Sequence, residues 1–178
     1  MKKIASAVTN ARSPSSPLPA MTLEDVYAAP GHLIRRAQQI AVAVFHEEFE
    51  GRDVTPVQYA ALIAIRDRPG MDQRTLVKFI AIDRSTVGTM LKGLENRRLI
   101  SRTTPKNDQR TKQLFIRPEG SRLLDETREN ITRVQQRILA PLGKDKRAFM
   151  LQLAKLVHLN NELSRAPLRS APAGRGRS

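Results

Sequence analysis

The chain has 178 residues, of which 31 are Lys or Arg and 17 are Asp or Glu, so its formal net charge at pH 7 is +14. A charge this positive favours nucleic acid as the partner, and less often an anionic membrane. The absence of cysteine excludes disulfides, thiolate nucleophiles and cysteine-ligated metals. No apolar run approaches the roughly 18 residues of a membrane-spanning helix, so we expect a cytoplasmic, nucleoid-associated protein with no membrane contact.

The two ends of the chain differ from its middle. Residues 1–20 are rich in Ser, Pro and Ala, and residues 165–178 are rich in Arg, Pro, Gly and Ser. Both lack the apolar residues that offset chain entropy, so we expect disordered arms. Such arms either keep the protein soluble or contact phosphates nonspecifically. Outside them the positive charge is concentrated in residues 72–117, with 11 basic and 4 acidic residues.

Apolar periodicity between the arms predicts six helices and one hairpin. Residues 31–49 place apolar side chains at three- and four-residue spacing, which indicates a packed helix. Thr55 can cap a second helix that has Pro56 at its first position and ends before Pro69.

Residues 72–81 and 83–97 then predict two short helices joined by a tight turn, which together form a helix-turn-helix. Asp72 and Asp83 are suitable caps. The second helix has an apolar face and an opposite face of small polar and cationic residues, namely Arg84, Ser85, Thr86, Gly88, Thr89 and Lys92. Short side chains let a helix enter a major groove about 12 Å wide and contact base edges. The alternative is an ordinary solvated helix face.

A short hairpin follows directly, with strands predicted near 99–103 and 113–117 around a polar turn. A hairpin in this position is typical of a wing that lies along the minor groove. Its candidate DNA contacts are Lys106, Arg110 and Lys112, and Asp108 is placed to orient Arg110. The alternative is a charged surface hairpin that serves solubility.

Two more apolar stripes, in residues 121–142 and 146–163, predict long helices near the C-terminal end. These stripes exceed what one small winged domain can cover, so pairing with a second chain is expected to bury them. The alternative is that they pack back on their own domain.

The sequence resembles the MarR (multiple-antibiotic-resistance regulator) family in three segments. Thr55-Pro-Val-Gln-Tyr-Ala-Ala-Leu62 is similar to the family's second helix, and Asp83-Arg-Ser-Thr-Val with Leu94-Glu-Asn-Arg-Arg-Leu-Ile100 is similar to its recognition helix and exit. Asp108-Gln-Arg110, followed by Leu114, Ile116 and Gly120, resembles its wing. The resemblance runs from about Pro30 to Leu163.

This resemblance implies a mainly α fold with a winged helix-turn-helix lobe, a two-stranded wing and an interlocking helical dimerisation region. The expected single domain covers residues 30–163, with the lobe at 54–117 and dimerisation helices at 30–53 and 118–163. It further implies a homodimer that binds successive major grooves of a pseudopalindromic double-stranded DNA operator.

Two positions depart from the family pattern. Arg98 stands where the family commonly has glycine, so the left-handed turn after the recognition helix is either strained or built differently. Arg117 and Pro118 replace the usual threonine cap, although Pro118 can still occupy the first helical turn.

The resemblance also implies a small aromatic or anionic effector that binds beside the dimerisation region. His32, Arg36 and Tyr59 are the candidates, because His32 and Arg36 lie one helical turn apart and together suit a carboxylate. The alternatives are a capping role for His32, a solvated Arg36 and a core Tyr59. Residues 30–36 also resemble members that control breakdown of nicotinate or related pyridine acids.

These observations predict a sequence-specific, ligand-responsive transcriptional regulator, in particular a repressor. The alternative is a nonspecific or architectural DNA-binding protein. No motif indicates an enzyme, and no catalytic residue, cofactor or metal is expected. His46 and His158 have no ligand spacing around them, so structural roles are expected for both.

Overall fold

The structure is a computed structural model that describes residues 20–82, 84–105, 111–164 and 166–168. For Arg84 and Ser85 the backbone alone is described. The chain divides into two units, residues 1–37 and 38–178, and each is treated separately below. Within the described ranges no helix has the length and apolar character needed to span a membrane.

The first unit contains a short helix that the sequence patterns did not predict, α1 (Leu23–Ala28). Thr22 and Asp25 form a capping box, in which the Asp25 N–H donates to Thr22 Oγ1 at 3.2 Å and the Thr22 N–H donates to Asp25 Oδ2 at 2.8 Å. The Thr22 N–H and the Thr22 hydroxyl both donate to Asp25 Oδ2 at 2.8 Å, and these two bonds lower the pKa of Asp25. The ring of Tyr27 lies 5.6 Å from that of His32, in the first turn of the next helix. The unit thus begins with a capped turn rather than a plain linker.

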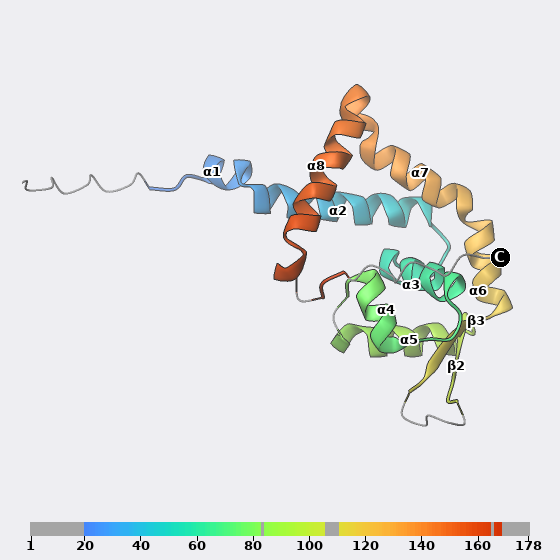
Figure 1. Cartoon of the computed structure of the whole chain (residues 1–178). Coiled ribbons are helices and arrows are strands. Elements are labelled where there is room, and N and C mark those ends of the chain that lie inside the picture. Colours follow the sequence, from blue (N-terminus) through green and yellow to red (C-terminus); the bar gives the residue numbers. More distant parts are fainter. Residues whose placement is uncertain (1–19, 83, 106–110, 165, 169–178) are drawn as a thin grey trace, which may run out of the picture. The chain divides into compact units, whose positions relative to one another are not determined.

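The helices of the winged lobe agree with the predictions to within one or two residues (Figure 1). The helices of the lobe are α3 (Pro56–Asp67), α4 (Gln73–Ile80) and α5 (Arg84–Asn96). The helix before them, α2 (Pro30–Glu48), also agrees with its prediction and runs from the first unit into the second.

The predicted cap of α3 is confirmed. Thr55 Oγ1 accepts from the Gln58 N–H, and the Gln58 side chain accepts from the Thr55 N–H, so two orphan donors are satisfied. Pro56 occupies the first helical position, where its missing N–H costs nothing.

The single long helix predicted over 121–142 is wrong. The structure has α6 (Pro118–Glu126), α7 (Arg128–Leu139) and the 3₁₀ helix η1 (Ala140–Asp145) in its place. The break lies at Thr127, which is fully buried and leaves helical geometry at φ −101° and ψ 13°. Its hydroxyl donates to the Leu123 carbonyl at 2.5 Å, so a side chain competes with the backbone for that acceptor. Pro118 does begin α6, as expected.

The last helix, predicted over 146–163, ends earlier, as α8 (Lys146–Leu159) followed by the 3₁₀ helix η2 (Asn161–Leu163). Beyond it, Leu168 exchanges two hydrogen bonds with the Asn161 side chain and Ala166 is buried. The C-terminal arm was predicted to begin at residue 165, and residues 166–168 are the part of it that the structure describes. The rest of both arms lies outside the described residues, apart from Ala20.

The hairpin is confirmed and belongs to a three-stranded antiparallel sheet in the order β1-β3-β2. Strands β2 (Ile100–Thr103) and β3 (Gln113–Ile116) form the wing, with Arg102 opposite Leu114. The short strand β1 (Met71–Asp72) adds to the other edge of β3, with Met71 opposite Leu114. Two residues are too few to show alternation, so no sequence pattern indicates β1.

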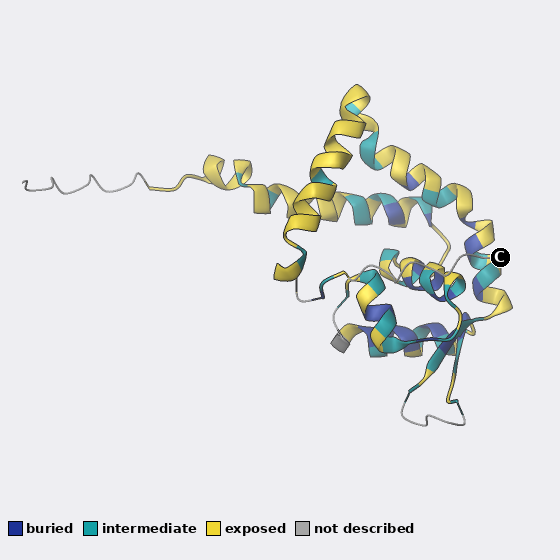
Figure 2. Ribbon diagram, viewed as in Figure 1, coloured by how far each residue is buried: buried dark blue, intermediate teal, exposed yellow. Residues whose placement is uncertain are grey.

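The buried core lies in the winged lobe and in the parts of α2, α6 and α7 that pack against it (Figure 2). The fully buried large side chains are Phe49, Leu62, Ile65, Leu76, Leu91, Leu94, Ile100, Leu114 and Leu124. Helix α8, by contrast, contains no buried residue, and Leu151, Val157 and Leu159 are more than half exposed. The first stripe thus packs on its own domain through Leu124 and Val134, whereas the α8 stripe stays exposed in the single chain.

The exit of α5 is a complete Schellman motif with arginine at its left-handed position. The Leu99 N–H donates to the Leu94 carbonyl at 3.0 Å, and the Arg98 N–H donates to the Glu95 carbonyl at 2.9 Å. Arg98 adopts φ 59°. Leu94 and Leu99 are both buried and supply the hydrophobic contact typical of this motif.

Gly120 in α6 lies against this exit. A Cβ at Gly120 would be 2.3 Å from the Leu99 carbonyl oxygen and 3.0 Å from Ile116 Cγ1. The same carbonyl accepts the Arg117 N–H at 3.0 Å, so it has little freedom to withdraw. Glycine is therefore required for α6 to approach the recognition helix.

We predict that Gly120→Ala lowers the free energy of unfolding by about 2 kcal/mol or more, because the methyl group overlaps a bonded backbone carbonyl. Urea denaturation measures this change. Gly93→Ala is the matched control, because nothing lies within 4 Å of a Cβ there and alanine favours the helix. Equal stability of both variants would contradict the close approach.

We predict that Arg98→Gly raises the free energy of unfolding by about 1 kcal/mol, because it removes the left-handed strain of an L-residue. Asn96→Gly, in the last helical position two residues earlier, is expected to lose stability instead. Thermal denaturation of the two variants tests this, and a loss in both would show that Arg98 bears no strain.

Candidate nucleic-acid interface and apolar pocket

Helix α5 has one buried face and one exposed face. Val87, Leu91 and Leu94 are fully buried against the lobe. On the other face Thr86, Thr89 and Lys92 are exposed and Gly88 is half-buried. The face predicted to contact DNA is thus accessible wherever it is described. The side chains of Arg84 and Ser85 lie outside the described residues, as does Asp83 with its predicted cap.

Helix α4 positions α5 through a tight turn. Asp72 caps α4 as predicted, accepting the Thr75 N–H at 2.6 Å. Burial raises the pKa of Asp72, but the hydrogen bonds from Thr75 and the nearby charges of Arg74 and Lys78 together bring it below its ordinary value. The helix ends at Ala81, which adopts the left-handed conformation at φ 49° and ψ 50°. Gly88 of α5 faces α4, with Gln73 Nε2 4.0 Å from its virtual Cβ. This distance is an ordinary van der Waals contact, so there is room for a Cβ at this position.

The wing is linked to α5 by an ion pair that sequence reasoning missed. Arg102 of β2 donates through Nε to Glu95 Oε2 at 2.7 Å, and its Nη2 contacts the same oxygen. This pairing lowers the pKa of Glu95. Its two residues are seven apart in sequence, and only the return of the chain after α5 brings them together.

At the tip of the wing, Lys112 is exposed just before β3. Lys106, Asp108 and Arg110 lie outside the described residues, so their predicted contacts with DNA stay predictions.

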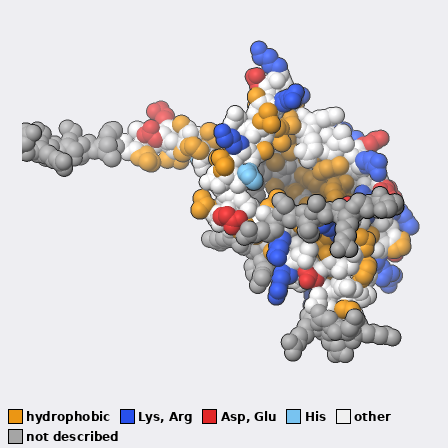
Figure 3. All heavy atoms as spheres, in the orientation of Figure 1, with side chains coloured by type: hydrophobic (Ala, Val, Ile, Leu, Met, Phe, Trp, Pro, Cys, Tyr) orange, Lys and Arg blue, Asp and Glu red, His pale blue; other side chains and the backbone are white. Residues whose placement is uncertain are grey.

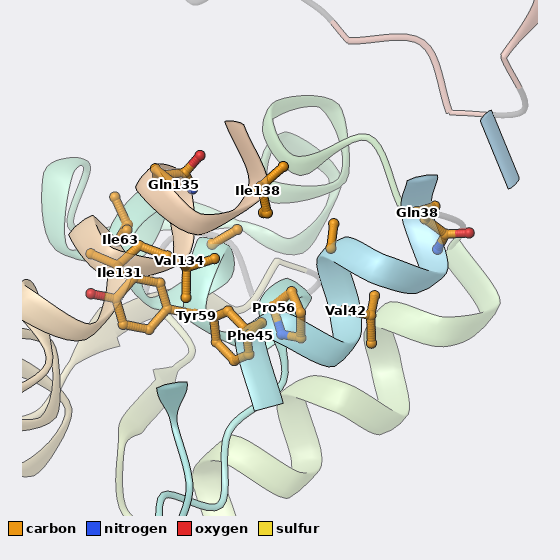
Figure 4. Close-up of a pocket in the computed structure, with 12 residues that line it drawn as sticks. Gln38, Val42, Phe45, Pro56, Tyr59, Ile63, Ile131, Val134, Gln135 and Ile138 are labelled. Atoms are coloured by element: carbon orange, nitrogen blue, oxygen red, sulfur yellow. The ribbon is translucent and has the colours of Figure 1, made fainter. Parts of the chain in front are cut away.

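The second unit also contains an apolar pocket of about 400 Å³. Hydrophobic side chains gather in a hollow between α2 and α3 (Figure 3), and the close-up shows α7 as its third wall (Figure 4). The lining residues are Gln38, Ala41, Val42, Phe45, Pro56, Tyr59, Ala60, Ile63, Ile131, Val134, Gln135 and Ile138. Sequence reasoning identified only Tyr59 of these.

The other two ligand candidates, His32 and Arg36, are not among the lining residues and belong to the first unit. His32 packs beside Tyr27, and its Nε2 is buried without a hydrogen-bond partner among the described residues. Arg36 is exposed.

Aromatic rings form the buried floor of the pocket. The Tyr59 ring meets Phe45 at 6.1 Å and Phe49 at 5.2 Å, in both cases edge to face, and the two phenylalanines stack at 4.0 Å. Edge-to-face packing places positive ring edges on negative ring faces. The floor is therefore fixed in orientation.

Ion pairs hold α2 against α7 beside the pocket. Glu48 accepts from Arg133 Nε at 2.7 Å and from Arg137 Nη1 at 2.8 Å, and Arg137 Nη2 also bonds Glu47 at 2.6 Å. The two arginines lower the pKa of Glu48, and the two glutamates raise that of Arg137. Asn130 Nδ2 donates to the Glu48 carbonyl on the same side.

Comparison with known proteins agrees with the winged helix-turn-helix fold of this chain. The sequence model of the MarR family matches residues 54–112, the span from the cap of α3 to the wing. The PcaV transcriptional regulator of Streptomyces coelicolor, in complex with its natural ligand, is 33% identical and has a TM-score of 0.70, covering 78% of this chain and 97% of that one. The chain belongs to the MarR family.

Two further relatives are similar to this MarR-family chain over most of its length. The HTH-type transcriptional repressor NicR of Pseudomonas putida is 27% identical over 143 residues, which are 80% of this chain and 90% of NicR. The structure of Bordetella bronchiseptica BpsR, described for the regulation of its DNA binding by 6-hydroxynicotinic acid, is 27% identical with a TM-score of 0.68. It covers 74% of this chain and 94% of that one.

We predict that the Glu95–Arg102 pair gives the winged lobe an acid-sensitive share of its stability. Because folding lowers the pKa of Glu95, this share is full above the unfolded pKa of about 4.3 and is lost as the pH falls through the lowered folded value. Glu95→Gln should lower the free energy of unfolding by about 1 kcal/mol or less at pH 7, since solvent screens the partly exposed pair.

Urea denaturation at pH 7 and pH 3 measures this difference between wild type and variant, which should shrink at pH 3. Glu129→Gln removes a 91% exposed partner at 3.9 Å from Arg133 and is the control, with little effect expected at either pH. A difference for Glu95→Gln that is equal at both pH values would exclude the ionised pair as its cause.

Proposed function

We propose that this MarR-family protein is a homodimeric, sequence-specific repressor that leaves a pseudopalindromic operator when a small aromatic or carboxylate ligand occupies the apolar pocket. The observation that carries the proposal is α5, a helix buried on one face and exposed on the other through Thr86, Thr89 and Lys92. Two relatives of the chain support the proposal, since NicR is named as a transcriptional repressor and BpsR is described for the regulation of its DNA binding.

The side chains of α5 suit a major groove. Threonine hydroxyls donate and accept hydrogen bonds at base edges, and a half-buried glycine keeps the helix slim. Lys92 on α5 and Lys112 on the wing place positive charge on two neighbouring elements, as phosphate contact requires. Phosphates then position the lobe while the threonines contact bases.

The exposed face of α8 supports a homodimer. Phe149, Met150 and Leu156 are each more than 40% exposed in the single chain, with the longer run of exposed apolar residues continuing to Leu163. An apolar surface of this kind is commonly covered by a partner chain. A twofold axis would repeat α5 at about one turn of DNA, which matches a pseudopalindrome.

The position of the pocket supports coupling between ligand and operator. Its α3 wall packs on α4 and β3 in the winged lobe and on α6, whereas its α2 and α7 walls are joined by the Glu48 ion pairs. A ligand that fits one spacing of these walls better than another shifts the population of lobe positions. DNA affinity then falls if the favoured spacing does not fit the operator.

A nonspecific or architectural DNA-binding protein is the second candidate, and the net charge of +14 favours it. It would use the same cations without base contacts. Its affinity for an operator and for a scrambled duplex would be equal at the same salt concentration.

We predict that Thr86→Ala and Thr89→Ala each weaken binding to the best genomic site by about 1–3 kcal/mol and relax its sequence preference. Lys112→Ala should instead reduce the salt dependence of binding, by about one unit of the log–log slope. Fluorescence anisotropy against operator and scrambled duplexes measures both effects.

Thr132→Ala, in an exposed position of α7, is the control and should bind as wild type does. Unchanged affinity in both α5 variants would exclude this face as the base-contacting one. Equal affinity of the wild type for both duplexes would establish the nonspecific alternative.

A further inference from the structure

Helix α4 carries two exposed cations on one side. Arg74 and Lys78 are four residues apart, so they lie one helical turn from each other on the same side of the helix. The apolar side of α4 is formed instead by Leu76 and Val77, which are buried in the lobe. The two cations therefore lie on the side of α4 that faces solvent.

The neighbours of α4 locate this side relative to the base-contacting helix, beside which α4 packs (Figure 1). Gln73 faces α5, with its Nε2 4.0 Å from the position of a Cβ on Gly88. Phe79 faces the end of α3, where a guanidinium covers its ring at 4.8 Å. Because successive helical residues are about 100° apart, Arg74 and Lys78 point about 100° and 140° away from Gln73. They lie between the α5-facing and α3-facing sides, on the open surface that begins next to α5.

The positive charge of this pair is not neutralised by an ion pair. The acid that precedes it, Asp72, already accepts the Thr75 N–H at 2.6 Å. Neither cation forms an ion pair with an acidic residue of the part of the chain that the structure describes. Arg102 of β2, by contrast, is paired with Glu95. Two positive charges of α4 thus stay available to an anion outside the chain.

The folding of α4 does not account for Arg74. This arginine is the second residue of the helix, in a first turn that contains no acidic residue. The N-terminal end of a helix carries a partial positive charge, so a cation there is unfavourable. A residue that opposes a local preference without a compensating contact is typical of a functional surface.

We propose that Arg74 and Lys78 bind the phosphate backbone of DNA beside the major groove that α5 enters. The first helix of a helix-turn-helix crosses the backbone while the second contacts base edges. Contacts with phosphates position a protein on the duplex and carry no sequence information. The inference rests on the proposed DNA binding and adds α4 to Lys92 and Lys112 as a phosphate-contacting element.

The test compares Arg74→Gln and Lys78→Gln with the wild type as full-length proteins. Fluorescence anisotropy measures binding to the best genomic site and to its scrambled sequence at salt concentrations between about 50 and 200 mM. Loss of one phosphate contact should lower the log–log salt slope by about 0.9 and weaken binding roughly five- to tenfold near 100 mM salt. Both duplexes should lose the same factor, so the preference for the operator stays unchanged.

The stability of Arg74→Gln separates binding from folding. Because the cation opposes the helix dipole, its removal should keep or slightly raise the midpoint of urea denaturation while DNA affinity falls. Arg74→Lys keeps the charge and should keep the salt slope.

Arg128→Gln is the matched control. Arg128 is an exposed cation in the first turn of α7, outside the lobe, so this variant removes the same charge from the same kind of helical position. It should leave the salt slope and both affinities nearly unchanged.

A lower slope and an equal loss for both duplexes in the α4 variants, without these effects in Arg128→Gln, supports the inference. An unchanged slope in both α4 variants overturns it and leaves the proposed repressor intact, provided that Thr86→Ala and Thr89→Ala still weaken operator binding. A loss confined to the operator would assign the α4 side chains to base edges, and an equal loss in Arg128→Gln would reduce the effect to net charge. Either result also overturns the inference. Failure of the wild type to bind either duplex overturns both the inference and the proposed function.

Discussion

The carbonyl of Leu99 is the point on which the winged lobe depends. The Leu99 N–H closes α5, and its carbonyl accepts the Arg117 N–H at the end of the wing. Gly120 brings α6 to within van der Waals contact of the same group. One residue therefore sets the positions of the recognition helix, the wing and the first helix of the C-terminal region. Because all three elements share it, the lobe is expected to move as a body when its neighbours shift.

Ion pairs connect the elements around this lobe and use many of the acids of a strongly basic chain. Glu95 holds the wing strand to α5, and Asp125 bonds Arg66 between α6 and α3. Glu48 holds α7 to α2. These acidic side chains pair with arginines of other elements and so connect those elements. Lysines such as Lys92 and Lys112 stay exposed and can contact an anionic partner.

The apolar surface is divided unevenly between the two ends of the second unit. The lobe buries most of its large apolar side chains, although Val57 and Ile63 of α3 are exposed, whereas α8 buries none. A single chain therefore folds its DNA-facing part and leaves its C-terminal helices incompletely covered. The apolar pocket lies between α2, α3 and α7, where the well-buried part of the unit meets the exposed C-terminal helices.

Patterns within one or two helical turns of sequence were enough to predict the helices of the winged lobe and their caps. Thr55 and Asp72 cap their helices, apolar periodicity located α3 to α5, and the small polar residues of α5 marked its exposed face, all of which depend on neighbours within one or two turns. Tertiary structure decided the rest. The break at Thr127 follows from burial of its hydroxyl beside Leu123, β1 exists only because β3 offers it an edge, and Arg98 is held left-handed by the bonds of Leu99. The pocket joins three helices that are distant in sequence, so Tyr59 was recognisable as a candidate while its glutamine and apolar partners were not.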